Sequence, residues 1–204
     1  MIQLHNVDSL VWLKDQKPFK AIITSLPDKE EVGMSELGWV QWLHHACELL
    51  AEKVDENGII FFYQMNRRIN GRLIDKNFLI SRVFIGAGYN KIIEKVCLKQ
   101  KVGTINPFRP TYTNLFAFSK SIRAGKSTAD VIFAGQMLYK NAMGSNAIQY
   151  CLDFIRTNVK TNTILDPFCG QGSILLGAKS KFFEGIGVDI DPEQIEIAKN
   201  NLGQ

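Results

Sequence analysis

The chain has 204 residues, of which 46% are hydrophobic and 22% charged, a composition typical of one globular α/β domain spanning 1–204. We expect neither a membrane span nor a signal peptide, because no run of about 18 apolar residues occurs and the first residues lack a basic-then-apolar pattern. The four cysteines form no C-x-x-C pair, which indicates neither a disulfide framework nor a metal site and favours a reducing intracellular compartment, cytoplasm or nucleus.

Strands and helices alternate along the whole chain. The expected elements are a strand at 2–5, a helical turn at 8–13, a strand at 19–24, an amphipathic helix at 35–53, a turn at 57–58, a buried strand at 59–63, a helix at 74–86, strands at 91–99 and 114–119, a helix at 146–159, a strand at 163–165, a strand ending at 189 and a helix at 192–202. This pattern predicts about seven strands in one sheet.

The formal net charge of +4 is unevenly distributed. The segment 63–126 holds 13 Lys and Arg against two acidic residues, so it carries about +11 and the rest of the chain about −7. Such asymmetry favours a polyanionic partner on one side of the domain. The alternative is a solvated basic face without a partner.

A glycine-rich stretch at 166–173, DPFCGQGS, lies between an apolar strand and an apolar helix. Gly170 and Gly172 can form a tight turn that lets the backbone approach a ligand closely. Asp189 ends the next strand about 20 residues further on, where an acid can accept hydrogen bonds from two ribose hydroxyls. Asp191 precedes a proline and an acid, which predicts the start of a helix. The stretch therefore predicts a nucleoside pocket, with Asp189 on the ligand and Asp191 on the helix.

The acid at the end of the strand at 163–165 indicates which kind of ligand suits this pocket. The loop lacks the G-x-G-x-x-G spacing of dinucleotide sites, and Asp166 would repel a pyrophosphate. A cationic ligand suits it better, such as the amino group and sulfonium of S-adenosylmethionine. The alternative is a structural turn without a ligand, but a buried acid beside two glycines is costly without a partner.

The stretch resembles the first motif of S-adenosylmethionine-dependent methyltransferases, in the D-P-F-x-G-x-G form of the amino-methyltransferases that modify DNA bases. The resemblance implies a Rossmann-like three-layer fold, with a mostly parallel sheet and an antiparallel edge strand. It also implies that Phe168 packs on the methionine part of the cofactor, that Asp166 holds its amino end and that Asp189 holds the ribose. The cofactor-binding residues expected on this basis are Asp8, Lys140, Asp166, Phe168, Cys169, Gly170, Gly172, Asp189 and Ile190.

The order of the motifs predicts a circular permutation. In methyltransferases of ordinary order, the helix expected at 192–202 is followed by a strand whose acid meets the adenine. Joining Gln204 to Met1 would restore that order, and one group of amino-methyltransferases has the same arrangement as this chain. Asp8 would then contact the adenine or its amino group; alternatively, it caps the helical turn that follows it.

The permuted order places the target loop directly after the strand at 19–24, where the chain reads Ser25-Leu26-Pro27-Asp28. The related motif has an Asp, Asn or Ser, two prolines and an aromatic residue. Its first side chain and the next carbonyl accept hydrogen bonds from the target amine, and the aromatic ring stacks on the flipped base. Ser25, the Leu26 carbonyl and Pro27 keep part of this pattern. Asp28 replaces the aromatic and either binds a target N–H, accepts a proton or forms a turn.

Two further segments are expected to form part of the pocket. The segment 106–112 carries Phe108, Arg109 and Tyr112, which can stack on a base and meet a phosphate, or form a rigid loop packed on the sheet. The segment 140–146 precedes a helix, and related enzymes close this part over the methionine carboxylate. Lys140 or exposed N–H groups at the helix start can bind that carboxylate.

The sequence favours methyl transfer to a nitrogen of a nucleic-acid base. Only a short connector occupies 121–137, where related DNA enzymes insert a target-recognition segment, so RNA is slightly favoured over DNA, with a partner protein or a homodimer as an option. The altered target loop leaves two alternatives, namely a methyltransferase for a small molecule or protein side chain and a cofactor-fold subunit without activity.

Overall fold

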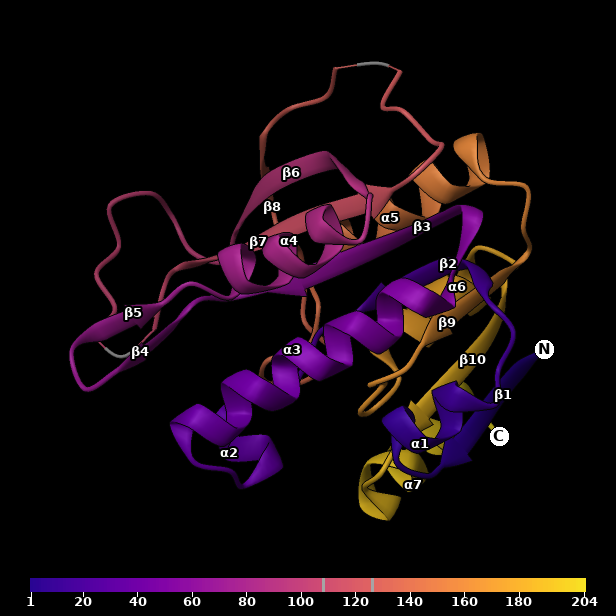
Figure 1. Ribbon diagram of the computed structural model, residues 1–204, viewed down its shortest axis with the longest axis horizontal. Coiled ribbons are helices and arrows are strands. Elements are labelled where there is room, and N and C mark those ends of the chain that lie inside the picture. The colour runs from indigo at the N-terminus through magenta and orange to yellow at the C-terminus, as the bar shows by residue number, and fades with distance from the viewer. Residues whose placement is uncertain (108, 126) are drawn as a thin grey trace.

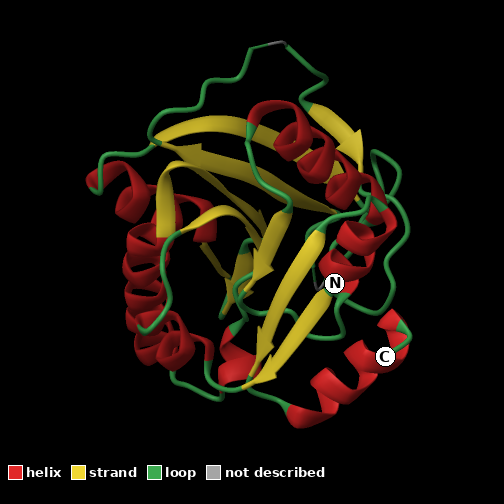
Figure 2. Ribbon diagram, turned by 90° about the vertical axis from the view of Figure 1, so that its right-hand side faces the viewer, coloured by secondary structure: helices red, strands yellow, loops and turns green. Residues whose placement is uncertain are grey.

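The computed structural model describes residues 1–107, 109–125 and 127–204. Helices cover both faces of a central twisted sheet, which gives three layers (Figures 1 and 2). The strands are β1 (Ile2–Asn6), β2 (Phe19–Thr24), β3 (Val54–Gln64), β4 (Arg67–Ile69), β5 (Arg72–Ile74), β6 (Asn90–Leu98), β7 (Tyr112–Ser119), β8 (Val131–Phe133), β9 (Thr163–Asp166) and β10 (Glu184–Asp189). The helices are α1 (Ser9–Lys14), α2 (Lys29–Val32), α3 (Glu36–Lys53), α4 (Lys76–Gly86), α5 (Ser145–Asn158), α6 (Ser173–Ser180) and α7 (Pro192–Leu202). None of these helices is long and apolar enough to cross a membrane.

The main sheet has the strand order β1-β10-β9-β2-β3-β7-β6-β8. The strands from β1 to β3 pair in parallel, β7 runs antiparallel to β3 and β6, and β8 pairs in parallel with β6. The mostly parallel three-layer fold is confirmed. The antiparallel strand lies inside the sheet, however, because β7 inserts between β3 and β6, whereas we expected it at the edge. The sheet also gains β8, since a three-residue strand is too short to show an alternating pattern.

Two apolar layers hold the helices against the sheet. Helices α1, α3 and α4 pack on one face through residues that include Leu13, Leu43 and Ile80. Helices α5, α6 and α7 pack on the other face. The run of apolar residues in β3 is continuous because Phe61 points into one layer and Phe62 into the other.

The turn expected at 57–58 is wrong as an element boundary. Strand β3 begins at Val54 and includes residues 57 and 58. Its pairing with β2 shifts register between Phe19 and Ala21. The Asn57 N–H donates to Asp55 Oδ1 at 2.9 Å, which gives the strand a local bend. Val54 and Ile59 pair with Phe19 and Ala21, which are only two residues apart on β2. Residues 55–58 therefore bulge out of the ladder, and the N-G dipeptide lies in this bulge.

The two ends of the chain lie side by side (Figure 1). Gln204 Nε2 donates to the Ile2 carbonyl at 2.8 Å, and the Met1 ammonium group lies 3.8 Å from a Glu184 carboxylate oxygen. The first strand, β1, also pairs in parallel with the last strand, β10. This geometry is the one that a circular permutation requires, and the permutation itself stays a prediction.

The parallel strands β10, β9, β2 and β3 end at the same edge of the sheet, where their last residues are Asp189, Asp166, Thr24 and Gln64. From β9 the chain proceeds to β10 on one side, while β2 and β3 lie on the other. Ligands of open α/β sheets bind at such a change of direction, outside the carboxyl ends of the strands. The fold therefore places the candidate site between the loop after β9 and the loop after β2.

We predict that Phe62 is a principal contributor to stability. Its ring is fully buried and lies 5.3 Å from Phe84, 5.6 Å from Phe116 and 6.2 Å from Phe118, measured between centroids. Phe62→Ala should lower the free energy of unfolding by about 3–5 kcal/mol in urea titrations. Phe78→Ala, on the exposed side of α4, is the matched control and should change it by about 0.5 kcal/mol or less. Equal losses in the two variants would contradict this assignment.

Candidate cofactor and target site

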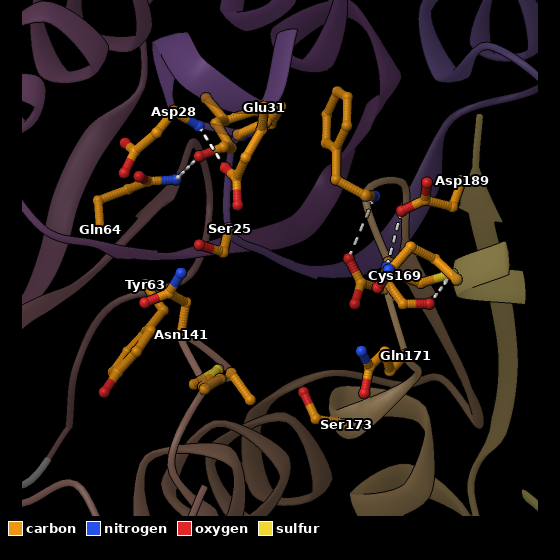
Figure 3. Close-up of a pocket in the computed structure, with 18 of the residues that line it drawn as sticks. Ser25, Asp28, Glu31, Tyr63, Gln64, Asn141, Cys169, Gln171, Ser173 and Asp189 are labelled. Atoms are coloured by element: carbon orange, nitrogen blue, oxygen red, sulfur yellow. Dashed lines mark hydrogen bonds between the residues drawn. The ribbon is translucent and has the colours of Figure 1, made fainter. Parts of the chain in front are cut away.

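A cleft of about 710 Å³ opens at the carboxyl edge of the parallel strands (Figure 3). This volume lies within the range of roughly 300–1,000 Å³ that is usual for small-molecule sites. Its lining includes the glycine loop at 166–173, the target loop at 25–28, the segment at 139–143, and residues of 8–10 and 189–191. Segments from the start and the end of the chain therefore meet around one cavity.

Most of the expected site residues line this cleft, namely Asp8, Ser25, Leu26, Pro27, Asp28, Lys140, Asp166, Phe168, Cys169, Gly170, Asp189 and Ile190. Gly172 is not among the lining residues; it is the residue before α6 and has a φ of 78°. Arg109 and Tyr112 are not among the lining residues. Arg109 reaches the rim through a hydrogen bond from its guanidinium group to the Asn141 side chain, whereas Tyr112 begins β7. The expectation for Phe108 lies outside the described residues.

Asp189 organises the part of the cleft beside the glycine loop, which we call the cofactor half. The Gly170 N–H donates to its Oδ2 at 2.8 Å, and the Asp191 N–H donates to its Oδ1 at 3.0 Å. Asp191 caps α7 through its own carboxylate, which accepts from the Glu193 N–H at 2.8 Å. The assignment of Asp191 to the helix is confirmed. The carboxylate of Asp189 is held in place by two backbone donors, and each oxygen keeps a lone pair for a ligand.

Asp166 is the most strongly perturbed acid of the cleft. Its side chain is 1% exposed. Its pKa is raised to about 8, chiefly by burial; a hydrogen bond from the Phe168 N–H opposes the shift, and the neighbouring Asp189 contributes to it. A buried carboxyl beside a second carboxylate is stabilised in its charged form by a bound cation. The electrostatics of the cleft therefore suit a cationic ligand at this position.

Tyr139 is a lining residue that the sequence analysis missed. Its hydroxyl lies so close to Gly170 that a Cβ at that position would be 2.7 Å away, and Gly170 itself has a φ of 48°. Burial raises the pKa of Tyr139 to about 12, and Asp166 contributes to the shift. The expected closing segment began at Lys140, one residue too late, because a tyrosine in a loop carries no distinguishing local pattern.

The helix start expected to bind a carboxylate is already satisfied within the protein. The Ser145 N–H donates to the Gln136 carbonyl at 2.8 Å, and the Asn146 N–H donates to the Ala134 carbonyl at 3.0 Å. The expectation of exposed N–H groups here is therefore wrong, because the segment after β8 folds across the start of α5. Lys140 remains, exposed at the rim of the cleft.

Asp8 caps α1, since its Oδ1 accepts from the Leu10 N–H at 2.7 Å and the Val11 N–H at 3.2 Å. The capping alternative is confirmed. Asp8 also lines the cleft, and the next residue, Ser9, donates a hydrogen bond to the Pro167 carbonyl. Helix α1 is thereby tied to the glycine loop, and the contact of Asp8 with an adenine stays a prediction.

The target loop is held by hydrogen bonds to its own carbonyl groups. The Leu26 carbonyl accepts from Lys76 Nζ at 3.2 Å and from Gln64 Nε2 at 3.5 Å, and the Pro27 carbonyl accepts from Trp39 Nε1 at 3.1 Å. Ser25 faces the cleft (Figure 3). The loop therefore presents a hydroxyl to the cleft while the protein occupies its backbone acceptors.

Asp28 takes part in ion pairs and in a helix start. Its Oδ1 lies 2.8 Å from Lys76 Nζ, its Oδ2 lies 3.4 Å from Arg67 Nε, and its N–H donates to Glu31 Oε2 at 2.6 Å. It precedes α2 as the capping residue. The turn alternative is confirmed, and a role in catalysis stays a prediction.

Internal ion pairs use part of the basic segment 63–126. Arg67 lies 2.7 Å from Glu30, Arg72 lies 3.0 Å from Glu36, and Lys76 is only 1% exposed. The charge that this segment offers to a polyanion is therefore smaller than its composition indicates. Lys76, which lines the cleft, was missed as a site residue because a cation in a basic segment is more often on the surface.

Comparison with known proteins gives a fold. No model of a known protein family matches the chain, and no curated protein matches it. Several solved structures, however, match its fold. TTHA0409 from Thermus thermophilus, a candidate DNA modification methylase, has a TM-score of 0.76 at 14% identity, over 100% of this chain and 94% of that one. A complex of M1.HpyAVI with SAM has a TM-score of 0.69 at 20% identity, over 100% of both chains. The PvuII DNA methyltransferase, which is cytosine-N4-specific, has a TM-score of 0.76 at 15% identity, over 98% of this chain and 86% of that one. The chain has the fold of these DNA methyltransferases.

We predict that Asp166 makes stability depend on pH. Its pKa is about 8 in the folded protein and roughly 4 in an unfolded chain, so its contribution to stability is complete below about pH 4 and is lost as the pH rises toward 8. Asp166→Asn removes this titration. Urea unfolding at pH 5, 7 and 9 should show the variant gaining stability relative to the unsubstituted protein at each step. A difference that does not grow with pH would contradict the prediction.

Proposed function

We propose that the protein is an S-adenosylmethionine-dependent methyltransferase that acts on a nitrogen of a nucleic-acid base. The observation that carries the proposal is one cleft in which the glycine loop with Asp166 and Asp189 faces the target loop with Ser25. The fold supports it, as do the similar structures TTHA0409 and M1.HpyAVI, both of which have been crystallised with the same cofactor. We further propose that residues 1–204 form a single domain of this kind.

The residues of the cofactor half fit S-adenosylmethionine. The buried carboxyl of Asp166 would hold the amino group, whose positive charge offsets the cost of ionising an acid in a dry site. Asp189, fixed by two backbone donors, would accept from the ribose hydroxyls, and Phe168 would pack on the methionine part. When bound, the cofactor supplies an electrophilic methyl group. The protein contributes binding and orientation.

The target half is the part of the cleft lined by the loop at 25–28, and its residues would orient the target nitrogen. The Ser25 hydroxyl would accept a hydrogen bond from the target N–H and so direct the nitrogen lone pair toward the methyl group. Arg109, near the rim, would meet a backbone phosphate. The proposed substrate is a nucleic acid, and RNA is favoured slightly over DNA because only a short connector with β8 occupies the place of a recognition segment.

A second candidate function is a cofactor-fold subunit without activity. It is favoured by the state of the target loop, in which the Leu26 carbonyl and both Asp28 oxygens already have protein partners. Binding of the cofactor without transfer to any acceptor would support it. A methyltransferase for a small molecule or a protein side chain differs in another way, since its activity would be insensitive to salt.

We predict that Asp189→Ala weakens S-adenosylmethionine binding at least tenfold in isothermal titration calorimetry. Charge-assisted hydrogen bonds of this kind contribute about 1.5–3 kcal/mol, which corresponds to a factor of roughly 10–150. Asp191→Ala is the matched control in the same turn. It should cost about 1 kcal/mol of stability as a lost helix cap and leave the affinity within about threefold. Equal affinities in the two variants would remove Asp189 from the ribose site.

We predict methyl transfer from labelled S-adenosylmethionine to unmethylated total RNA or genomic DNA, with a rate that falls steeply as salt rises from about 50 to 200 mM. Ser25→Ala should reduce transfer about a hundredfold, because the target nitrogen loses its orienting acceptor. Cofactor affinity of this variant should be unchanged. If neither nucleic acid accepts a methyl group, the proposal of a nucleic-acid methyltransferase fails.

A further inference from the structure

Lys76 is a charged residue in a place where lysine is rarely found. It is the first residue of α4, it is 1% exposed, and it lines the cleft at the target loop. Its Nζ donates to the Leu26 carbonyl at 3.2 Å and to Asp28 Oδ1 at 2.8 Å. The same group lies 5.6 Å from the centroid of the Trp39 ring. One ammonium group therefore joins the second and the fourth residue of the target loop.

We infer that Lys76 is a positioning residue of the target half, which holds the loop at 25–28 in its working shape by tying the Leu26 carbonyl to the Asp28 carboxylate. This inference rests on the proposed function and deepens it. It also assigns Asp28 the role of counter-ion to Lys76, in place of the target-binding or proton-accepting roles that the sequence left open.

The start of α4 aims the Lys76 side chain at the loop. The Lys76 N–H donates to Asn66 Oδ1 at 2.9 Å, and Asp75 caps the helix by accepting from the Phe78 N–H at 3.1 Å. Both contacts fix the first turn of the helix. The lysine therefore reaches a loop about 50 residues earlier in the chain from a rigid base, with little freedom to leave it.

The remaining contacts of the loop support a holding role. Trp39 Nε1 binds the Pro27 carbonyl, and Arg67 Nε lies 3.4 Å from the second oxygen of Asp28. In contrast, none of the hydrogen bonds among the described residues involves the Ser25 hydroxyl, which faces the cleft. The loop thus separates two tasks, with Ser25 directed at a target and its neighbours bonded to the protein.

Burial makes a purely stabilising role a poor explanation. Burial lowers the pKa of Lys76, and the Asp28 carboxylate opposes the shift. Buried ion pairs often stabilise a fold no better than apolar residues of the same size, because both charges lose their hydration. What an apolar residue cannot do is bond the Leu26 carbonyl and the Asp28 carboxylate at once. The pair therefore determines the shape of the loop.

The test compares Lys76→Met, Lys76→Arg, Asp28→Asn and the double variant Lys76→Met/Asp28→Asn. Each is measured for S-adenosylmethionine affinity by calorimetry, for unfolding in urea, and for kcat and KM of methyl transfer. Lys53→Met is the matched control, because Lys53 Nζ also makes two hydrogen bonds within the protein, to the carbonyl groups of Lys14 and Gln16, away from the cleft. If the unsubstituted protein transfers no methyl group, the proposed function has failed and the comparison does not arise.

We expect Lys76→Met to lower kcat about a hundredfold, the cost of misplacing a reacting group by about 1 Å, with cofactor affinity within about threefold. Lys76→Arg should restore most of the rate, because it keeps a charged donor. Asp28→Asn should destabilise the protein by leaving the ammonium unpaired, and the double variant should recover stability while kcat stays low. A kcat that recovers together with stability in the double variant, or a Lys76→Met enzyme as fast as Lys53→Met, would overturn the inference.

Discussion

The site depends on two acids at the ends of adjacent parallel strands. Strands β9 and β10 pair so that Asp166 lies opposite Gly187, two residues before Asp189, and the sheet therefore brings two carboxyl groups to one edge. Backbone N–H groups donate a hydrogen bond to each carboxylate oxygen of Asp189. Asp166, in contrast, is buried and has a raised pKa. The glycine loop takes its shape from Asp189, and the need for a cation comes from Asp166.

The order of the strands explains why distant segments share this edge. Strand β2 pairs in parallel with β9, so the loop that follows β2 must open beside the glycine loop. Strand β1 lies beyond β10, and its following helix is joined to the glycine loop through Ser9 and Pro167. Both termini lie at the far side of the sheet, away from the chemistry. Chain ends at this place are compatible with the predicted circular permutation, which stays a prediction.

The sequence was sufficient where local patterns determine structure. Glycines followed by an acid about 20 residues later predicted that Gly170 and Asp189 meet at one cleft, and periodicity predicted the main helices and strands. It was insufficient where contacts join distant residues. Lys76 reaches Leu26 across 50 positions, Tyr139 covers Gly170 from a loop, and β8 has three residues, none of which leaves a periodic trace. Charge counting likewise overstated the basic surface, because it treats a buried ion pair as a free cation.

The fourth residue of the target loop bears on how the loop is held. In the motif that the sequence resembles, an aromatic ring follows the second proline and stacks on the base. Asp28 stands there in this chain, and a carboxylate near a low-dielectric cleft requires a counter-charge. Lys76 supplies it at 2.8 Å. The same ammonium group also donates to the Leu26 carbonyl, so that one lysine holds both residues of the loop. A base entering this cleft would then be oriented by the Ser25 hydroxyl, without an aromatic ring of the loop to stack on.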